Sequence, residues 1–413
     1  MRAAVLSALV ALLSVAPCGA QTLLQRPLPG TPPRVPGQEL QPPFRAPITL
    51  TPSIEAGIEY NDNIFLDNRQ REDDFVFLFA PALTFTAERP TWRLNAGYRF
   101  ENRIYMDHSE LNEAFDRQAF ALDSFYRLAP NLTLSLDDEF NYETGVNPFS
   151  RPSTQTFATG RSAFWTNTIR PGLTWQADPQ TTVRGFLAWT IQRYDDPDLI
   201  DSDSYHADIA LERVLMPRLR GITGYKFAYF DVKRADDATT HTPLIGARYD
   251  FTPTLSGTLA GGPIVVLEDG KDTRLAPYIN ADLLAVFRWG TTAIRYTRDV
   301  GLAGGIGGTA DNDLFELIVL MSRVWRGLSV EFAPNFQRSQ SEDHRVDVKA
   351  VSVPLTLTYQ FMPWFSVSAG YAFLHQTDDS AVRGAVTGEP LARDVDQNRV
   401  FFTVVFGYPI RFD

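Results

Sequence analysis

Apolar and polar residues alternate along the chain from residue 48 to the C-terminus. In the segment TWRLNAGYRFENR, residues 91–103, aromatic and aliphatic side chains occupy every second position, and most positions between them carry Arg, Asn or Glu. Residues 131–143, 328–337 and 400–412 show the same period of two. Side chains that alternate in this way lie on opposite faces of a β-strand. We find no convincing helical stripe, so the pattern predicts an all-β fold.

The connections between the predicted strands alternate between short and long. Eight short turns contain Pro or Gly, at residues 88–91, 129–131, 177–180, 215–218, 251–255, 289–291, 325–328 and 361–364. Nine longer polar segments separate them, at residues 61–73, 107–114, 145–161, 195–203, 234–240, 268–272, 301–311, 339–345 and 376–396. These seventeen connections predict eighteen strands.

Prolines within or near the predicted strands make this count uncertain. Each proline removes a hydrogen-bond donor from the sheet, so we interpret these residues as bulges or strand ends. The expected number of strands is therefore about 16–18. The prolines concerned are Pro81, Pro171, Pro243, Pro277, Pro334, Pro354 and Pro409.

Two architectures are compatible with these strands. A soluble sandwich or propeller would pack the apolar faces together, and a hairpin spacing of roughly 41 residues also occurs in propeller blades. A transmembrane barrel would turn the apolar faces to lipid and the charged faces to a lumen. The predicted strands have about ten to fourteen residues, which is long for a soluble sheet and suits a tilted membrane crossing. We therefore predict a transmembrane, antiparallel, up-and-down β-barrel over residues 48–413.

The positions of tryptophan favour the barrel. Five of the seven tryptophans flank predicted short turns, and only Trp165 and Trp189 lie elsewhere. Tryptophan gathers at the interface between lipid and water, so this distribution predicts an aromatic belt at one end of the barrel. The five residues are Trp92, Trp175, Trp289, Trp325 and Trp364.

The N-terminal 47 residues differ from the rest of the chain. Residues 1–20 have one Arg, an apolar run and a site of small residues, which predicts a cleaved signal peptide. The one cysteine, Cys18, lies within it, so the mature chain would have no disulfide and no cysteine-based metal site. Residues 21–47 contain eight prolines, which predicts an extended periplasmic tether. The net charge of −11 and the lack of a basic block argue against a nucleic-acid partner.

The segment GIEYNDNIF at residues 57–65, its acidic loop and FAPALTFTAERPTWRLNAGYRFENRIY at 79–105 resemble the β-barrel porin 2 family of outer-membrane proteins. The resemblance is strongest over residues 50–145. It implies a barrel in the outer membrane of a Gram-negative bacterium, often encoded with exopolysaccharide or surface-glycan loci. Lipid and lipopolysaccharide would then surround the chain.

The C-terminal segment FGYPIRFD resembles the signal that the barrel-assembly machinery recognises in outer-membrane proteins. Gly407, Ile410 and Phe412 match its spacing, whereas Val405 and Asp413 depart from it. The resemblance implies that the assembly machinery is a partner of this chain. An ordinary lipid-facing last strand is the alternative.

Few residues suggest chemistry at the long-loop end. His108 follows Asp107, but a catalytic base would need a second carboxylate to orient it, and the serine, zinc and thiol motifs of hydrolases are absent. We expect no catalytic residue, metal or cofactor. Carboxylates of the first long loop are ligands that calcium accepts, but the spacing and glycine of an EF-hand are missing. These carboxylates are Asp62, Asp67, Glu72, Asp73 and Asp74.

The inner face of the predicted barrel carries both signs of charge. Such a lining can set a transverse field and bind hydroxyl-rich solutes, and it can equally form salt-bridge ladders that stiffen the barrel. The predicted pore-lining residues are Arg93, Arg99, Glu101, Arg103, Asp137, Glu139, Glu143, Arg184, Asp282, Arg295 and Glu331.

Three functions remain open from the sequence. The first is a porin-like channel for small solutes, linked through the family resemblance to exopolysaccharide or surface-glycan export. The second is a plugged structural barrel that anchors or docks a partner through residues 21–47. The third, a surface hydrolase, would use His108 and His375. The sequence leaves the oligomeric state open, and either the 145–161 or the 376–396 loop could fold into the lumen.

Overall fold

The computed structural model describes residues 48–412 except 150–156, 343–344 and 389. The predicted signal peptide (1–20) and tether (21–47) lie outside the described residues. Within the described part, the one helical element is a single 3-10 turn, η1 (Ser109–Leu111). No helix in this part is long and apolar enough to cross a membrane.

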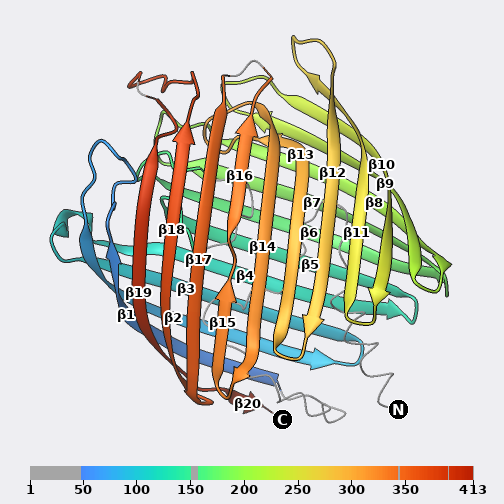
Figure 1. The fold of residues 1–413 in the computed structure, drawn as a ribbon, viewed down its shortest axis with the longest axis horizontal. Helices are drawn as coiled ribbons and strands as arrows, with labels where there is room; N and C mark the ends of the chain where they lie inside the picture. Colours follow the sequence, from blue (N-terminus) through green and yellow to red (C-terminus); the bar gives the residue numbers. More distant parts are fainter. Residues whose placement is uncertain (1–47, 150–156, 343–344, 389, 413) are drawn as a thin grey trace.

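Twenty antiparallel strands form one closed sheet (Figure 1). The first ten are β1 (Ile48–Asn61), β2 (Asp74–Arg89), β3 (Trp92–Tyr105), β4 (Glu113–Ala129), β5 (Leu132–Thr144), β6 (Ala163–Asp178), β7 (Thr181–Tyr194), β8 (Ser202–Met216), β9 (Leu219–Val232) and β10 (Ala238–Thr252). The others are β11 (Leu255–Glu268), β12 (Arg274–Phe287), β13 (Gly290–Leu302), β14 (Thr309–Trp325), β15 (Leu328–Phe332), β16 (Asn335–Gln340), β17 (Asp347–Met362), β18 (Phe365–Asp378), β19 (Val395–Gly407) and β20 (Ile410–Phe412).

Two pairs of strands are each one crossing of the barrel wall. β15 and β16 both pair with β14 on one side and β17 on the other, and β19 and β20 both pair with β1. The twenty strands therefore make eighteen crossings, and the pairing of β1 with β19 closes the sheet. The predicted all-β, up-and-down barrel of about 16–18 strands is confirmed.

Hairpin turns of two residues lie at one end of the barrel. The eight turns occupy residues 90–91, 130–131, 179–180, 217–218, 253–254, 288–289, 326–327 and 363–364. Seven lie within the predicted segments, and the turn at 288–289 begins one residue before the predicted 289–291. Gly327 has a φ of 83°, and a Cβ there would lie 2.8 Å from the carbonyl oxygen of Gln360, so this turn requires glycine. The longer connections all lie at the opposite end (Figure 1).

The interpretation of the strand prolines is partly wrong. Pro334 and Pro409 do end strands, because they separate β15 from β16 and β19 from β20. Pro81, Pro171, Pro243, Pro277 and Pro354 instead lie inside continuous strands and form no bulge. Pro81 stays paired with Ile54 of β1, while the pairing of β2 with β3 skips from Phe79 to Ala82 without a change of register. The missing N–H therefore interrupts one ladder only locally.

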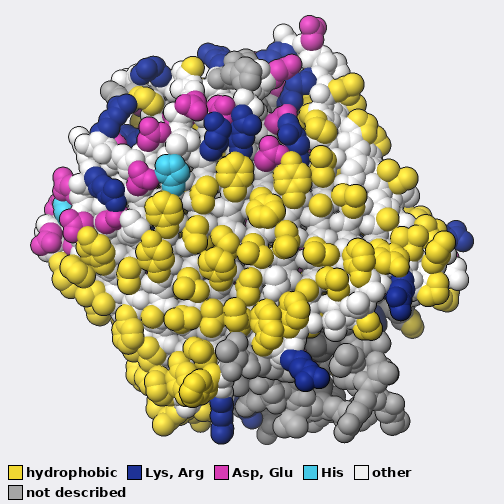
Figure 2. Space-filling view, in the orientation of Figure 1, with side chains coloured by type: hydrophobic (Ala, Val, Ile, Leu, Met, Phe, Trp, Pro, Cys, Tyr) yellow, Lys and Arg dark blue, Asp and Glu magenta, His cyan; other side chains and the backbone are white. Residues whose placement is uncertain are grey.

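The outer face of the barrel is a belt of apolar side chains. Ile54, Phe75, Phe77 and Phe79 are 38–48% exposed on it. Figure 2 shows this belt across the middle of the molecule, with charged side chains gathered above it. Exposed tryptophans mark its short-turn side, as predicted, at Trp175, Trp325 and Trp364.

An aromatic row also lies in the long-loop half of the outer face. The rings of Trp189, Tyr205 and Tyr229 stack across β7, β8 and β9 with centroid distances of 6.0 and 6.1 Å. Aromatic girdles on both sides of an apolar band are typical of strands that cross a bilayer.

The inner face differs between the two ends of the barrel. In the half next to the long loops, inward side chains such as Val76, Val348 and Gln376 are fully buried. In the half next to the short turns, inward ion pairs such as Glu55 with Arg99 remain partly exposed, whereas smaller inward polar side chains such as Thr84 and Ser366 are buried. We call these the long-loop half and the short-turn half.

The C-terminal residues close the wall beside the first strand. Gly407 is the last residue of β19, and Ile410 and Phe412 belong to β20. Phe412 pairs with Ile48, and Ile410 pairs with Leu50. Both side chains are exposed on the outer face.

Candidate functional site

In the loop between β5 and β6, the described residues 145–149 and 157–162 fold into the barrel. We call these residues the inward loop. The Ser352 hydroxyl of β17 donates a hydrogen bond to the carbonyl oxygen of Pro148 at 3.1 Å. The side-chain amide of Gln376 in β18 accepts from the N–H of Ala158 and donates to its carbonyl oxygen, both at 2.8 Å. Along the wall, β4, β3, β2, β1, β19 and β18 separate β5 from β17, so the loop bridges the interior.

Aromatic contacts hold the first part of this loop against β19. The ring of Phe149 packs edge-on against Phe401, with centroids 4.8 Å apart. The guanidinium of Arg399 lies 5.4 Å from the centre of the Phe149 ring and donates to the Asn147 side chain at 3.2 Å. A cation over an aromatic face is attracted by the ring, more strongly where water is excluded. Arg399 therefore fastens the loop at two residues.

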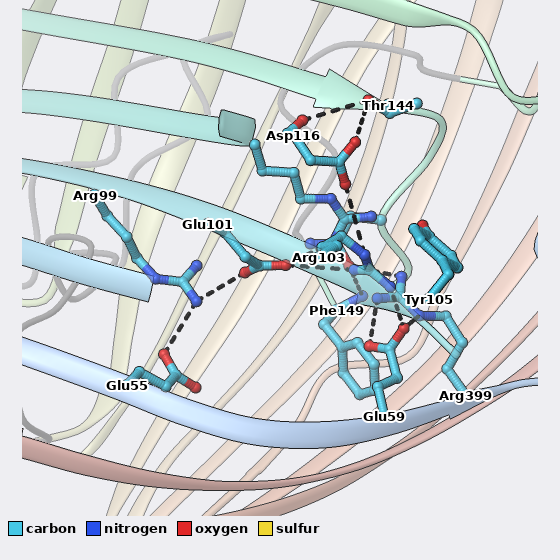
Figure 3. A network of polar contacts seen from close by, with 12 residues as sticks. Glu55, Glu59, Arg99, Glu101, Arg103, Tyr105, Asp116, Thr144, Phe149 and Arg399 are labelled. Carbon is cyan, nitrogen blue, oxygen red and sulfur yellow. Dashed lines mark hydrogen bonds and ion pairs between the residues drawn. The ribbon is translucent and has the colours of Figure 1, made fainter. Parts of the chain in front are cut away.

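Arg399 belongs to a buried ionic cluster (Figure 3). The carboxylate of Glu59 in β1 accepts hydrogen bonds from Arg399 at 2.6 and 3.0 Å and from Arg103 in β3 at 2.6 Å. The side chains of Glu59 and Arg103 are both 2% exposed. Two guanidiniums around one carboxylate supply the charge and the donors that a buried carboxylate needs.

The cluster continues along β3 and β4 to the inward loop. Glu101 contacts Arg99 at 2.8 Å, Arg103 at 3.4 Å and Arg117 at 3.8 Å. Arg99 also reaches Glu55 at 3.0 Å. Asp116 lies 3.6 Å from Arg103 and 3.7 Å from Arg161 of the inward loop, whose guanidinium also donates to the Tyr105 hydroxyl at 2.7 Å. The ionic cluster thus comprises Glu55, Glu59, Arg99, Glu101, Arg103, Asp116, Arg117, Arg161 and Arg399.

A local irregularity brings Asp116 into this cluster. Phe115 has a φ of 65°, and the register between β3 and β4 shifts between Glu101 and Arg103. Alternation is interrupted there, so the consecutive residues Asp116 and Arg117 both reach the cluster.

All eleven predicted pore-lining residues lie on the inner face. Arg99, Glu101 and Arg103 meet in the ionic cluster. Five others form four separate ion pairs around the wall: Arg93 with Asp123 at 2.7 Å, Asp137 with Arg170 at 3.2 Å, Arg184 with Glu212 at 2.8 Å, and Arg295 with Asp282 at 3.1 Å. Glu139 accepts from Asn141 at 3.0 Å, while Glu143 and Glu331 are placed by their registers opposite Phe164 and Thr356.

Six members of the ionic cluster are absent from the prediction. Glu55 and Glu59 alternate with Ile54 and Ile58 in β1, and Arg399 precedes the outward-facing Val400, so the period of two could have identified these three. Asp116, Arg117 and Arg161 depend on the irregularity at Phe115 and on the path of the inward loop.

Five long loops pack together at the end of the long-loop half. Asp198 joins two of them, because it accepts hydrogen bonds from the backbone N–H groups of Val386 and Thr387 and from the Thr387 hydroxyl. The Thr387 hydroxyl and these backbone donors hold the pKa of Asp198 below its usual value. The apolar side chains that the loops bury together, here called the loop cap, are Phe157, Leu199, Ala303, Ile306, Val346, Leu391 and Ala392.

His108 and His375 each lie beside carboxylates. Nε2 of His108 lies 2.6 Å from Glu72, and Nδ1 lies 3.0 Å from Asp74. Hydrogen bonds to these two carboxylates raise the pKa of His108 above its ordinary value of 6.5. His375 lies on the outer face with Asp396 at 2.7 Å.

The carboxylates of the first long loop have separate partners. Asp62 pairs with Arg71, Asp67 with Arg393, and Asp73 accepts from the Tyr60 hydroxyl. Across the described ranges, no group of three or more His, Cys, Asp or Glu residues is placed to hold a metal ion.

Comparisons with known proteins yield only distant likenesses. No family model matches the chain, so the resemblance to the β-barrel porin 2 family is not confirmed. No curated protein matches it either. Among solved structures, OccAB4 of Acinetobacter baumannii is 12% identical with a TM-score of 0.45, over 89% of this chain and 99% of that one. The outer-membrane protein OpdK of Pseudomonas aeruginosa is 11% identical with a TM-score of 0.43, over 89% and 100%.

Proposed function

We propose that this chain is a solute channel of the Gram-negative outer membrane, narrowed in its long-loop half by the inward loop. The observation that carries the proposal is the contrast along the inner face. Partly exposed ion pairs line the short-turn half, whereas the inward loop and the buried part of the ionic cluster, around Glu59 and Arg103, occupy the long-loop half. Eighteen-stranded barrels are wide enough for an aqueous path unless their loops narrow it.

The outer face supports the membrane location. A band of exposed aliphatic and aromatic residues with aromatic rows at both sides is stable in lipid, and closure of the sheet pairs the strand edges. We place the short turns in the periplasm and the long loops outside the cell. Lipid and lipopolysaccharide would surround the wall, and Gly407, Ile410 and Phe412 would be recognised by the assembly machinery.

The lining supports polar, hydroxyl-rich solutes as cargo and involves no turnover chemistry. Guanidinium and carboxylate groups alternate around the short-turn half, and both bind hydroxyl groups as planar donors or acceptors. The more specific proposal that the cargo is an exopolysaccharide or surface glycan rests only on the resemblance of residues 50–145 to the β-barrel porin 2 family.

A plugged structural barrel is the second candidate, and the loop cap favours it. Phe157, Leu199, Ile306 and Leu391 exclude water from the end of the long-loop half. In this case the barrel would serve as an anchor, and residues 21–47 would dock a periplasmic partner. Deleting 21–47 would then abolish docking and leave the barrel intact.

Single-channel recording in planar bilayers tests the proposal. We expect small, discrete conductance steps from the purified mature chain, and several-fold larger steps from Gln376→Leu, which removes both hydrogen bonds to Ala158. Gln360→Leu is the matched control, because this glutamine lies near a short turn and donates only to the carbonyl oxygen of Pro363 at 3.4 Å. Absence of conductance in all three proteins would contradict the channel and favour the plugged barrel.

A further inference from the structure

A carboxylate lies on the outer face of the barrel at the middle of a strand. Asp138 is the seventh of the thirteen residues of β5, six residues from each end of the strand. Its neighbours on the same face along β5 are Leu136 and Phe140, and Leu136 is exposed. Alternation places the adjacent residues Asp137 and Glu139 on the inner face, so Asp138 cannot reach the lumen.

Among the residues that the structure describes, Asp138 has a single polar partner. The side-chain amide of Asn167 in β6 donates to the Asp138 carboxylate at 2.8 Å. No Lys, Arg or His pairs with Asp138 within the described part of the chain. Three outward carboxylates near the long loops differ from Asp138, because Asp311 and Asp313 pair with Arg298, and Asp347 pairs with Arg338 and Lys349.

Further polar groups extend this site over the neighbouring strands. On the outer face of β4, the Gln118 side chain accepts from the Tyr98 hydroxyl at 2.9 Å, and the Ser124 hydroxyl donates to the carbonyl oxygen of Leu136 at 2.9 Å. We call Gln118, Ser124, Asp138 and Asn167 the outer polar strip. It crosses β4, β5 and β6, and in the registers Asp138 lies between Leu122 of β4 and Ile169 of β6.

Acyl chains are a poor environment for this strip. Hydrocarbon offers no donor to a carboxylate, and a charged or polar group facing lipid at mid-depth is destabilising. One amide satisfies only part of the hydrogen-bonding capacity of a carboxylate, which has about four lone-pair sites. Within the described residues no further donor reaches these sites, so a donor from a neighbouring molecule would satisfy them.

We propose that the outer polar strip is the contact surface for a second copy of this chain in the membrane. Asp138 supplies acceptors and Asn167 supplies donors side by side, so the strip is self-complementary. In a symmetric pair, Asn167 of each copy can donate to Asp138 of the other. The apolar side chains around it, Leu122, Leu136, Phe140 and Ile169, pack against their counterparts.

Cross-linking in isolated outer membranes tests this interface, which rests on the proposed membrane location. In a Cys18→Ser background, Leu136→Cys places a thiol within the strip, and Leu259→Cys places one on the outer face of β11 as a matched control. With a short bismaleimide, we expect at least tenfold more covalent oligomer from Leu136→Cys than from Leu259→Cys. Adding Asp138→Leu and Asn167→Leu should reduce it at least tenfold, because the apolar surface then suits lipid.

Equal cross-linking of the two cysteine variants, or cross-linking that survives the double leucine change, would overturn the interface. If Leu136→Cys fails to fold, Leu122→Cys on β4, which pairs with Asp138, provides the same measurement. A charged maleimide added to sealed vesicles distinguishes a failure of the proposed membrane location from a failure of the proposed interface. Rapid labelling of Leu259→Cys would contradict the membrane location itself, whereas loss of oligomers without such labelling would contradict only the interface.

Discussion

Two ion pairs join β1 to β3 across β2, and they differ in what covers them. Glu55 with Arg99, in the short-turn half, has both side chains 26% exposed. Glu59 with Arg103, four residues further along both strands, has both side chains 2% exposed. The residue types are the same, and the inward loop accounts for the difference. Because the value of an ion pair depends on burial, the first pair belongs to the lining and the second belongs to the packed interior.

The largest expected effect comes from neutralising the buried carboxylate. Glu59→Gln leaves Arg103 and Arg399 facing each other without the charge that separates them, and breaking a buried pair of this kind destabilises by about 3–5 kcal/mol. Glu55→Gln should lower the free energy of unfolding by less than about 1 kcal/mol, as partly exposed pairs do. Urea unfolding in lipid vesicles, followed by tryptophan fluorescence, measures both.

The two variants are matched, since each removes one charge from β1 without changing side-chain size. Equal destabilisation would show that the two halves of the inner face do not differ in their hydration, and the comparison above would fail.

The strand pattern predicted which side chains point inward but not how deeply they lie. A period of two determines the face of a residue, and so Arg99 and Arg103 were placed together with Arg93 and Arg184. Only Arg103 is buried, and its burial depends on the inward loop, whose contact with Gln376 joins residues 218 positions apart. Loops have no periodicity in their hydrophobic and polar residues. The sequence therefore identified residues 145–161 and 376–396 as the two loops that could enter the lumen, but it did not show which of them does. The sequence pattern also did not predict the position of Asp116, because this position depends on the positive φ of Phe115.

A smaller effect is expected when the loop cap is loosened. Asp198→Ala removes the acceptor that joins the loops at residues 195–201 and 379–394. Amide hydrogens of Val386 and Thr387 should then exchange at least tenfold faster, and single-channel currents should become noisier. Hydrogen exchange with mass spectrometry checks the first effect.

Asp236→Ala is the control for this change, since Asp236 is also a loop carboxylate and its partner Lys271 lies 3.9 Å away. Unchanged exchange in Asp198→Ala would mean that apolar packing alone closes the long-loop half.

The smallest effect concerns pH and the outer loops. The pKa of His108 is raised by Glu72 and Asp74, so its stabilising contacts are complete below the ordinary value of 6.5 and are lost as pH rises through the higher, folded-state value. Amide exchange of residues 106–112 should therefore accelerate above pH 6.5, beyond the intrinsic rise. In His108→Gln this additional acceleration should disappear, and its persistence would assign the pH dependence to other groups.

The most direct test uses two neighbouring residues on opposite faces of β1. Ile54 is exposed on the outer face, and Glu55 belongs to the lining of the short-turn half. In a Cys18→Ser background reconstituted into vesicles, a charged, membrane-impermeant maleimide should label Glu55→Cys at least tenfold faster than Ile54→Cys, and it should reduce the single-channel current only in Glu55→Cys. Rapid labelling of Ile54→Cys would contradict an apolar outer face in contact with lipid. A Glu55→Cys thiol that the reagent cannot reach would contradict a water-filled, charged interior.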